Sequence, residues 1–184
     1  MTFLPWMMLY QSLYGHFLGP STIRMNMSGQ FWHFGRGETL MGVLICPARG
    51  LFVYQPWAIL ALVGVWHALR PKSEDRALRG FAIFCLGVIA AHVTLIAAWH
   101  DWSGGYCWGS RLLTEIIPLL GLLAVTPIEF LLRSRGGLAI LLILGVAGAM
   151  THLPGVYLGA PKWNYVTDHD RDLWSWTNAP FFYR

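Results

Sequence analysis

The stretch "WHDWSGGYCWGSR", residues 99–111, places charged, aromatic and glycine residues together between two long apolar runs. Arg111 is its only fixed cation and stands where the next apolar run begins. A helix amino terminus favours anions, and an arginine fork binds two phosphate oxygens at once, so Arg111 is a candidate phosphate ligand. An ion pair with Glu115, four residues further along the same helix, is the alternative, and both can hold.

The rest of this stretch carries groups that suit the mouth of a polar pocket. His100 and Asp101 are adjacent, and Asp101 can act as a base or hold a cation, although a pair hydrated at the interface is the preferred interpretation. Trp102 presents a flat face that suits a sugar ring or a lipid headgroup. Gly104 and Gly105 permit a tight turn that brings backbone amides near a ligand.

A second cationic constellation, "CPARGLFVYQP" at residues 46–56, stands just before another apolar run. A proline and a glycine bracket Arg49, which places this arginine in a stiff turn at the membrane edge. It is well placed for a lipid-linked phosphate, and the alternative is an interfacial anchor that sets helix depth. Glu115 lies about one turn inside its apolar run, where ionisable groups are costly and often functional, so Asp101 and Glu115 are the candidate catalytic carboxylates.

Two histidines, His92 and His152, fall inside apolar runs. A hydrogen bond to a neighbouring helix is the preferred interpretation for each, ahead of a proton relay. A transporter or proton channel would need both of them and Glu115 to face one cavity. Glu129 is expected to pair with Arg133, because the two have the favoured four-residue spacing.

The cysteines and acidic residues do not define a metal site. The three cysteines lack metal-ligand spacing, and the sequence leaves a disulfide between Cys46 and Cys107 open. "TDHDRD", residues 167–172, has a composition that a divalent ion would accept, but a solvated acidic turn is the preferred interpretation. No cofactor is evident from the sequence and no metal ligands are assigned, while a divalent metal stays an unsupported alternative.

The composition indicates a membrane protein. The chain is 55% hydrophobic and 12% charged, and its charged residues fall between long uncharged runs. Runs of about 20 apolar residues match the hydrocarbon thickness of a bilayer, whereas a soluble domain needs more polar surface. We predict an all-α polytopic transmembrane helical bundle, in a single domain. Four spans are expected at about 51–69, 80–99, 112–132 and 136–158, with a fifth at about 3–18.

The basic residues predict the orientation. Four of them occupy the 70–79 hairpin and two the 133–135 turn, so both regions are expected in the cytoplasm. The segments 19–50, 100–111 and 159–184 are then extracytoplasmic, with the amino terminus inside and the carboxyl terminus outside. The net charge of +4 follows this topology and does not indicate nucleic-acid binding.

Three ordered motifs resemble large bacterial membrane proteins. These are "GVLICPARGLFVYQPWAILALVG" (42–64), "WHDWSGGYCWGSRLLTEIIPLL" (99–120) and "DRDLWSWTNAPFF" (170–182). The resemblance is to membrane-embedded C-type glycosyltransferases (GT-C), the broad group that contains protein mannosyltransferases. Ser110 stands where that pattern has Pro, and Cys46 where it has Ser.

The resemblance implies transfer of a sugar from a polyprenyl-phosphate donor at the outer face of the bacterial inner membrane. Arg49 and Arg111 would contact the donor phosphate, while Asp101, Trp102 and the two glycines would shape the pocket mouth. The family's catalytic acidic residue lies in an earlier loop that nothing here matches, so the chain resembles a carboxyl-terminal half whose partner is an upstream half. The rival hypothesis is a non-catalytic membrane protein that binds lipid headgroups or scaffolds a partner.

Overall fold

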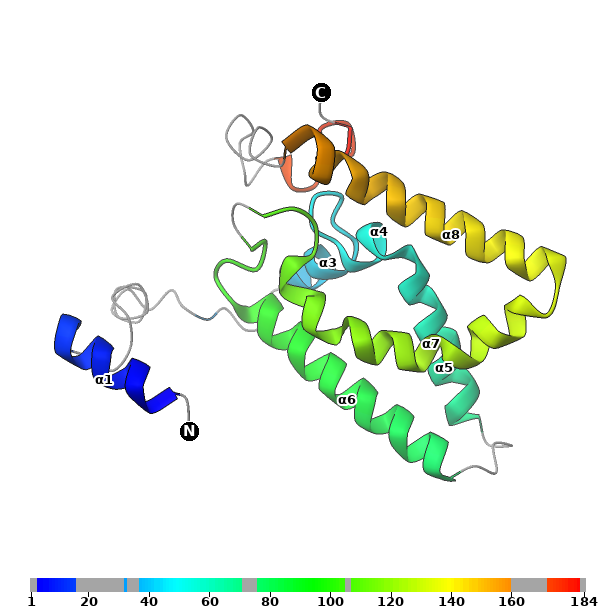
Figure 1. The fold of residues 1–184 in the computed structure, drawn as a ribbon, viewed down its shortest axis with the longest axis horizontal. Coiled ribbons are helices and arrows are strands. Elements are labelled where there is room, and N and C mark those ends of the chain that lie inside the picture. Colours follow the sequence, from blue (N-terminus) through cyan, green and yellow to red (C-terminus); the bar gives the residue numbers. More distant parts are fainter. Residues whose placement is uncertain are drawn as a thin grey trace.

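The computed structural model describes residues 3–15, 32, 37–70, 76–104, 107–159 and 172–182. Within these ranges the regular elements are helices, and the remaining pairing is an isolated bridge between Trp32 and Trp99. The predicted all-α class is confirmed. Figure 1 shows α1 (Phe3–Tyr14) to one side of the other helices.

Three helical stretches are long and apolar enough to cross a membrane. They are α6 (Arg76–Ala98), the continuous pair η2 (Arg111–Ile116) and α7 (Ile117–Leu132), and α8 (Arg135–Pro154), which continues into η3 (Gly155–Gly159). These agree closely with three of the predicted spans. They support a membrane protein, whereas the side of the membrane that each end faces stays a prediction.

The predicted span 51–69 is broken into shorter pieces. It consists of α4 (Leu51–Tyr54), η1 (Pro56–Ala58) and α5 (Ile59–Leu69), with Gln55 between α4 and η1. Proline disfavours the helical region for the residue before it, and Gln55 accordingly has φ −126° and ψ 65°. The helical stretch from η1 to the end of α5 is shorter than the other three, as is α1 within the predicted span 3–18. A count of four or five spans therefore stays a prediction.

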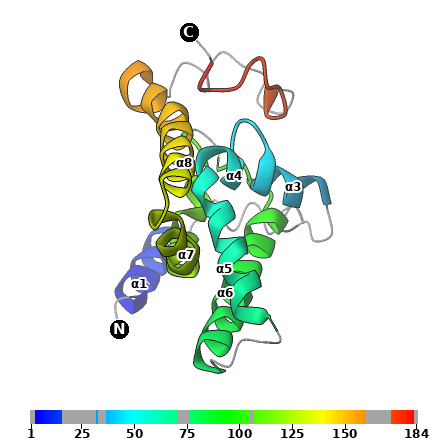
Figure 2. The same ribbon diagram turned by 90° about the vertical axis from the view of Figure 1, so that its right-hand side faces the viewer.

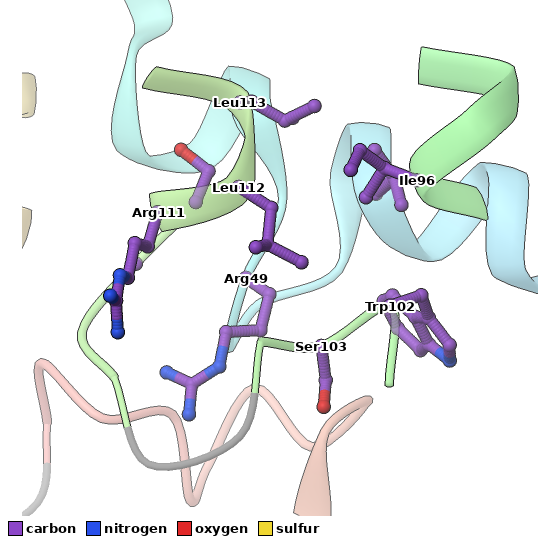
Figure 3. A pocket seen from close by; sticks show the side chains of 10 residues that line it. Arg49, Ile96, Trp102, Ser103, Arg111, Leu112 and Leu113 are labelled. Atoms are coloured by element: carbon purple, nitrogen blue, oxygen red, sulfur yellow. The ribbon is translucent and has the colours of Figure 1, made fainter. Parts of the chain in front are cut away.

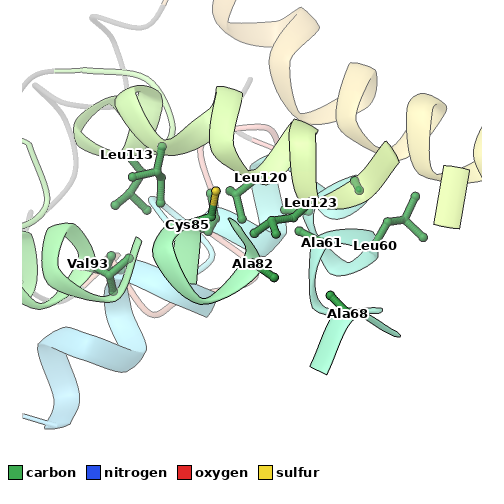
Figure 4. Close-up of a cluster of buried hydrophobic side chains, with 14 of the residues drawn as sticks. Leu60, Ala61, Ala68, Ala82, Cys85, Val93, Leu113, Leu120 and Leu123 are labelled. Carbon is green, nitrogen blue, oxygen red and sulfur yellow. The ribbon is translucent and has the colours of Figure 1, made fainter. Parts of the chain in front are cut away.

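Small residues let the helices of the core approach closely. Alanines of α5, α6 and α7 are buried in one cluster with larger apolar side chains from the same helices and η2 (Figure 4). The tightest approach is at Gly64 of α5, where a Cβ would overlap the backbone carbonyl of Leu123 on α7. Close packing of this kind is typical of membrane helices, which gain little from burying apolar surface against one another.

The chain ends its long helices alternately at two ends of the bundle. Figures 1 and 2 show the end of α8 and the segment 172–182 on the same side of the molecule as α3 (Gly37–Ile45) and α4. The end of α5 and the start of α6 lie at the opposite end. The described parts of the predicted extracytoplasmic segments thus gather at one end, which is where the candidate site lies.

Candidate functional site

Arg49 and Arg111 line the same pocket. The empty space between its lining atoms, including space that is open to solvent, is about 210 Å³. Trp102 and Ser103 also line the pocket. Figure 3 shows Arg49 between Arg111 and Ser103, with both guanidinium groups extending in the same direction. The other lining residues are Val43, Ile96, Gly109, Ser110, Leu112 and Leu113. The fold therefore brings together the two arginines that the sequence identified separately.

Arg49 is held in a tight turn between α3 and α4. The amides of Arg49 and Gly50 both donate to the carbonyl of Cys46, at 3.2 and 2.6 Å. A Cβ at Gly50 would come within 2.6 Å of the Cys46 backbone nitrogen, so the turn needs glycine. Arg49 is only 3% exposed, and a cation so far removed from water interacts strongly with any anion that reaches it.

Arg111 does not form the anticipated ion pair with Glu115. Both residues lie in η2, a 3₁₀ helix with three residues per turn, so side chains four positions apart lie on different faces. Glu115 instead places Oε2 3.6 Å from Nε2 of His92 on α6. Arg111 is exposed, and its guanidinium makes no hydrogen bond or ion pair within the described ranges. It is available to a ligand.

His92 connects α6 to the start of η2. Its Nε2 lies 2.9 Å from the carbonyl oxygen of Leu112, and because a carbonyl only accepts, Nε2 carries the proton. His152 of α8 similarly lies 3.1 Å from the Tyr54 carbonyl oxygen. Both histidines are thus hydrogen-bonded between helical elements, as preferred from the sequence. The expected pair of Glu129 and Arg133 is also confirmed, at 2.8 Å.

The candidate residues of the 99–111 stretch divide into two groups. Trp102 lines the pocket directly, whereas His100, Asp101 and Gly104 belong to the loop that holds it. The Gly104 amide donates to the Asp101 carbonyl at 2.9 Å, and Gly104 has φ +76°, a backbone conformation that favours glycine. Gly105 lies outside the described residues. The loop supports the aromatic face of the pocket.

Two glycines that the sequence analysis did not single out leave room for the side chains of Trp102 and Tyr54. A Cβ at Gly42 of α3 would overlap the indole of Trp102. Gly109 has φ +64°, and a Cβ there would come 2.8 Å from Cδ1 of the fully buried Tyr54. Gly109 lies between Trp108 and the polar pair Ser110 and Arg111. This position was the sequence signal that could have identified Gly109 as a site residue.

The carboxyl-terminal segment contacts the Arg49 turn. The thiol of Cys46 donates to the Leu173 carbonyl at 2.7 Å, and burial raises the pKa of this thiol. Cys46, Cys85 and Cys107 are free thiols in the structure, so no Cys46–Cys107 disulfide is formed. Sequence pattern alone gave no sign of the contact with Leu173.

The described residues contain no group of His, Cys, Asp or Glu side chains arranged to hold a metal ion. Residues 167–171 of the acidic turn lie outside the described ranges. Asp172, which is described, accepts a hydrogen bond from Nδ2 of Asn178 at 3.1 Å. Its visible role is to shape the local turn.

Comparison with protein-family models, curated proteins and solved structures gave no match. The described residues define an all-helical protein with three helices long and apolar enough for a membrane. At one end of these helices lies a pocket with two arginines and a tryptophan.

Proposed function

We propose that the chain is part of an integral membrane glycosyltransferase-like protein that holds a polyprenyl-phosphate-linked sugar on the extracytoplasmic face of a bacterial inner membrane. The observation that carries this proposal is the meeting of Arg49 and Arg111 in one pocket with Trp102. Two guanidinium groups suit a phosphate, since each offers a planar fork of donors. An indole beside them suits the ring or chain attached to that phosphate.

The chemistry assigns the arginines to the leaving group. When a sugar leaves a lipid phosphate, negative charge develops on the phosphate, and fixed cations stabilise it in the transition state. A buried Arg49 is pre-organised for this role because it needs little reorientation. Arg111, exposed at the pocket edge, would guide the phosphate in.

The same transfer needs a carboxylate that takes the proton of the acceptor hydroxyl. No Asp or Glu is among the described lining residues. Asp101 accepts a 3.4 Å hydrogen bond from Ser103, a lining residue, and Glu115 lies beside His92. We infer that the base comes from an upstream half of the protein, with Asp101 and Glu115 as the candidates within this chain.

The arrangement of helix ends supports an outward-facing pocket. The segment 172–182 and the end of α8 lie at the pocket end, while the end of α5 and the start of α6 lie at the other (Figure 1). The basic residues near these two helix ends favour the cytoplasmic side. The proposed topology places the amino terminus inside and the carboxyl terminus outside.

A second candidate function is non-catalytic binding of lipid headgroups. The lack of a carboxylate among the described lining residues favours it, because binding a phosphate needs only the cations. Both candidates predict binding of farnesyl phosphate and little binding of farnesol. They differ in turnover: the longest encoded chain that contains residues 1–184 should transfer sugar from a polyprenyl-phosphate donor if the first proposal holds.

The experiment measures both properties on purified protein in detergent. Tight binding of farnesyl phosphate with turnover supports the glycosyltransferase proposal, and binding without turnover supports the headgroup-binding alternative. Equal affinity for farnesyl phosphate and farnesol would refute both, since neither explains an arginine pocket that ignores phosphate. Residues 1–184 alone should not transfer sugar from the donor. Measurable transfer would indicate that Asp101 or Glu115 acts as the base.

A further inference from the structure

The segment 172–182 holds the Arg49 turn through a backbone carbonyl. The thiol of Cys46 donates to the Leu173 carbonyl at 2.7 Å, and the amide of Ala48 donates to the same oxygen at 3.3 Å. These two donors lie on either side of a proline in the turn. One carbonyl oxygen therefore fixes the backbone immediately before Arg49.

Side-chain packing joins the same segment to the aromatic wall of the pocket. Cys46, Ala48 and Leu173 form a buried apolar cluster, and Trp102 packs against it. Leu173 is 5% exposed, so its side chain is as well packed as a core leucine. The cluster contacts both the cation-bearing turn and the indole that lines the pocket.

The carboxyl-terminal end of the segment, residues 179–181, also packs against the helices. Ala179 and Pro180 are buried, and the ring of Phe181 meets that of Tyr54 edge-on with centroids 6.1 Å apart. Tyr54 ends α4, the short helix that follows the Arg49 turn. The segment thus contacts the chain both before and after Arg49.

We propose that the segment 172–182 is a positioning element of the pocket, and that Leu173 is the residue through which it fixes Arg49. Leu173 itself does not line the pocket. Its effect on ligand binding rests on the proposed anion site, whereas the anchoring of the turn is measured without any ligand.

Alkylation of the native thiols by iodoacetamide, followed by mass spectrometry of each peptide, measures the anchor in the full chain. Cys46 is fully buried and its thiol pKa is raised, so it should react slowly in the wild type. Leu173→Ala should speed its alkylation by about tenfold, because local opening becomes easier. Leu173→Met, which conserves volume, should restore slow alkylation.

Two references separate local release from general loosening. Cys85 is fully buried in α6 and serves as the internal reference in every sample. Leu120→Ala removes a leucine that is likewise 5% exposed, but from α7, and should leave Cys46 slow. Unchanged Cys46 alkylation in Leu173→Ala, or an equal rise at Cys85, would overturn the anchor.

Binding of farnesyl phosphate then tests whether the anchor acts through Arg49. Leu173→Ala should weaken binding by about two- to tenfold in a chain with Arg49, and should add nothing in an Arg49→Ala background. Binding of inorganic phosphate is measured beside binding of farnesyl phosphate. The comparison shows whether the phosphate alone accounts for the affinity or the prenyl chain contributes to it. An additive loss in the double variant would overturn positioning through Arg49.

If Arg49→Ala leaves binding of farnesyl phosphate unchanged, the proposed anion site is wrong. The proposal that Leu173 affects ligand binding by positioning Arg49 is then wrong as well. The alkylation rate of Cys46 still decides whether Leu173 anchors the turn. The two failures are therefore distinguishable.

Discussion

Arg49 and Arg111 line one pocket but differ sharply in exposure, since Arg49 is 3% exposed in a turn and Arg111 is exposed at the start of η2. Mobile ions screen an exposed charge far more than a buried one. The two arginines should therefore contribute to anion binding in different ways. Arg111 contributes an attraction that salt weakens, and Arg49 contributes one that salt affects little.

Arg111→Ala should weaken binding of farnesyl phosphate about ten- to a hundredfold, because a charged hydrogen bond is worth about 1.5–3 kcal/mol. Arg111→Lys should recover part of the loss, since it keeps the charge and loses the planar fork. Titration calorimetry at low and high salt measures both effects, and the salt dependence should shrink in Arg111→Ala. Arg135→Ala is the control and should not weaken binding, because this exposed arginine at the start of α8 does not line the pocket. An unchanged dissociation constant in folded Arg111→Ala removes this arginine from the site.

His92 should influence binding without touching the ligand. Its Nε2–H donates to the carbonyl of Leu112, a residue that lines the pocket next to Arg111. His92→Leu removes the donor and should weaken farnesyl phosphate binding about two- to tenfold, the range expected for one hydrogen bond. His92→Gln offers an amide donor and should recover much of that loss. Equal affinities for the Leu and Gln variants would show that the hydrogen bond is not what positions η2.

The long helices could be predicted because bilayer-length apolar runs leave few alternatives. α6, η2 with α7, and α8 lie where the sequence placed spans. The break at Gln55 was harder to place, because a proline near the start of a run either kinks a helix or ends it. Pro127 illustrates the difficulty: it lies inside α7 and does not end it.

The two arginines of the site were predicted, but their surroundings were not. Residue types and nearby apolar runs identify Arg49 and Arg111 as interfacial cations. The missing Arg111–Glu115 pair depends on η2 being a 3₁₀ helix, which the residue spacing does not reveal. The contact of Leu173 with the Arg49 turn uses a backbone carbonyl, and every residue has one.

The predicted topology can be tested with single cysteines. Thr177→Cys lies at an exposed position of the segment 172–182, and Ser73→Cys lies in the basic hairpin. An impermeant maleimide should label Thr177→Cys in intact spheroplasts and should reach Ser73→Cys only after permeabilisation. The native thiols are buried and should give little background. The reverse pattern would place the pocket in the cytoplasm and refute a donor bound at the outer face.

Gly64 should be the most sensitive glycine of the helical core. A Cβ there would overlap the Leu123 carbonyl, so Gly64→Ala must separate α5 from α7. We expect a loss of about 1–3 kcal/mol in the free energy of unfolding, the usual cost of overpacking. Gly121→Ala is the matched control, because it lies within α7 and a Cβ there meets nothing within 4 Å. It should leave stability unchanged or raise it by up to about 1 kcal/mol through helix propensity. Thermal unfolding in detergent compares the two variants, and equal melting temperatures would mean that α5 and α7 do not meet at Gly64.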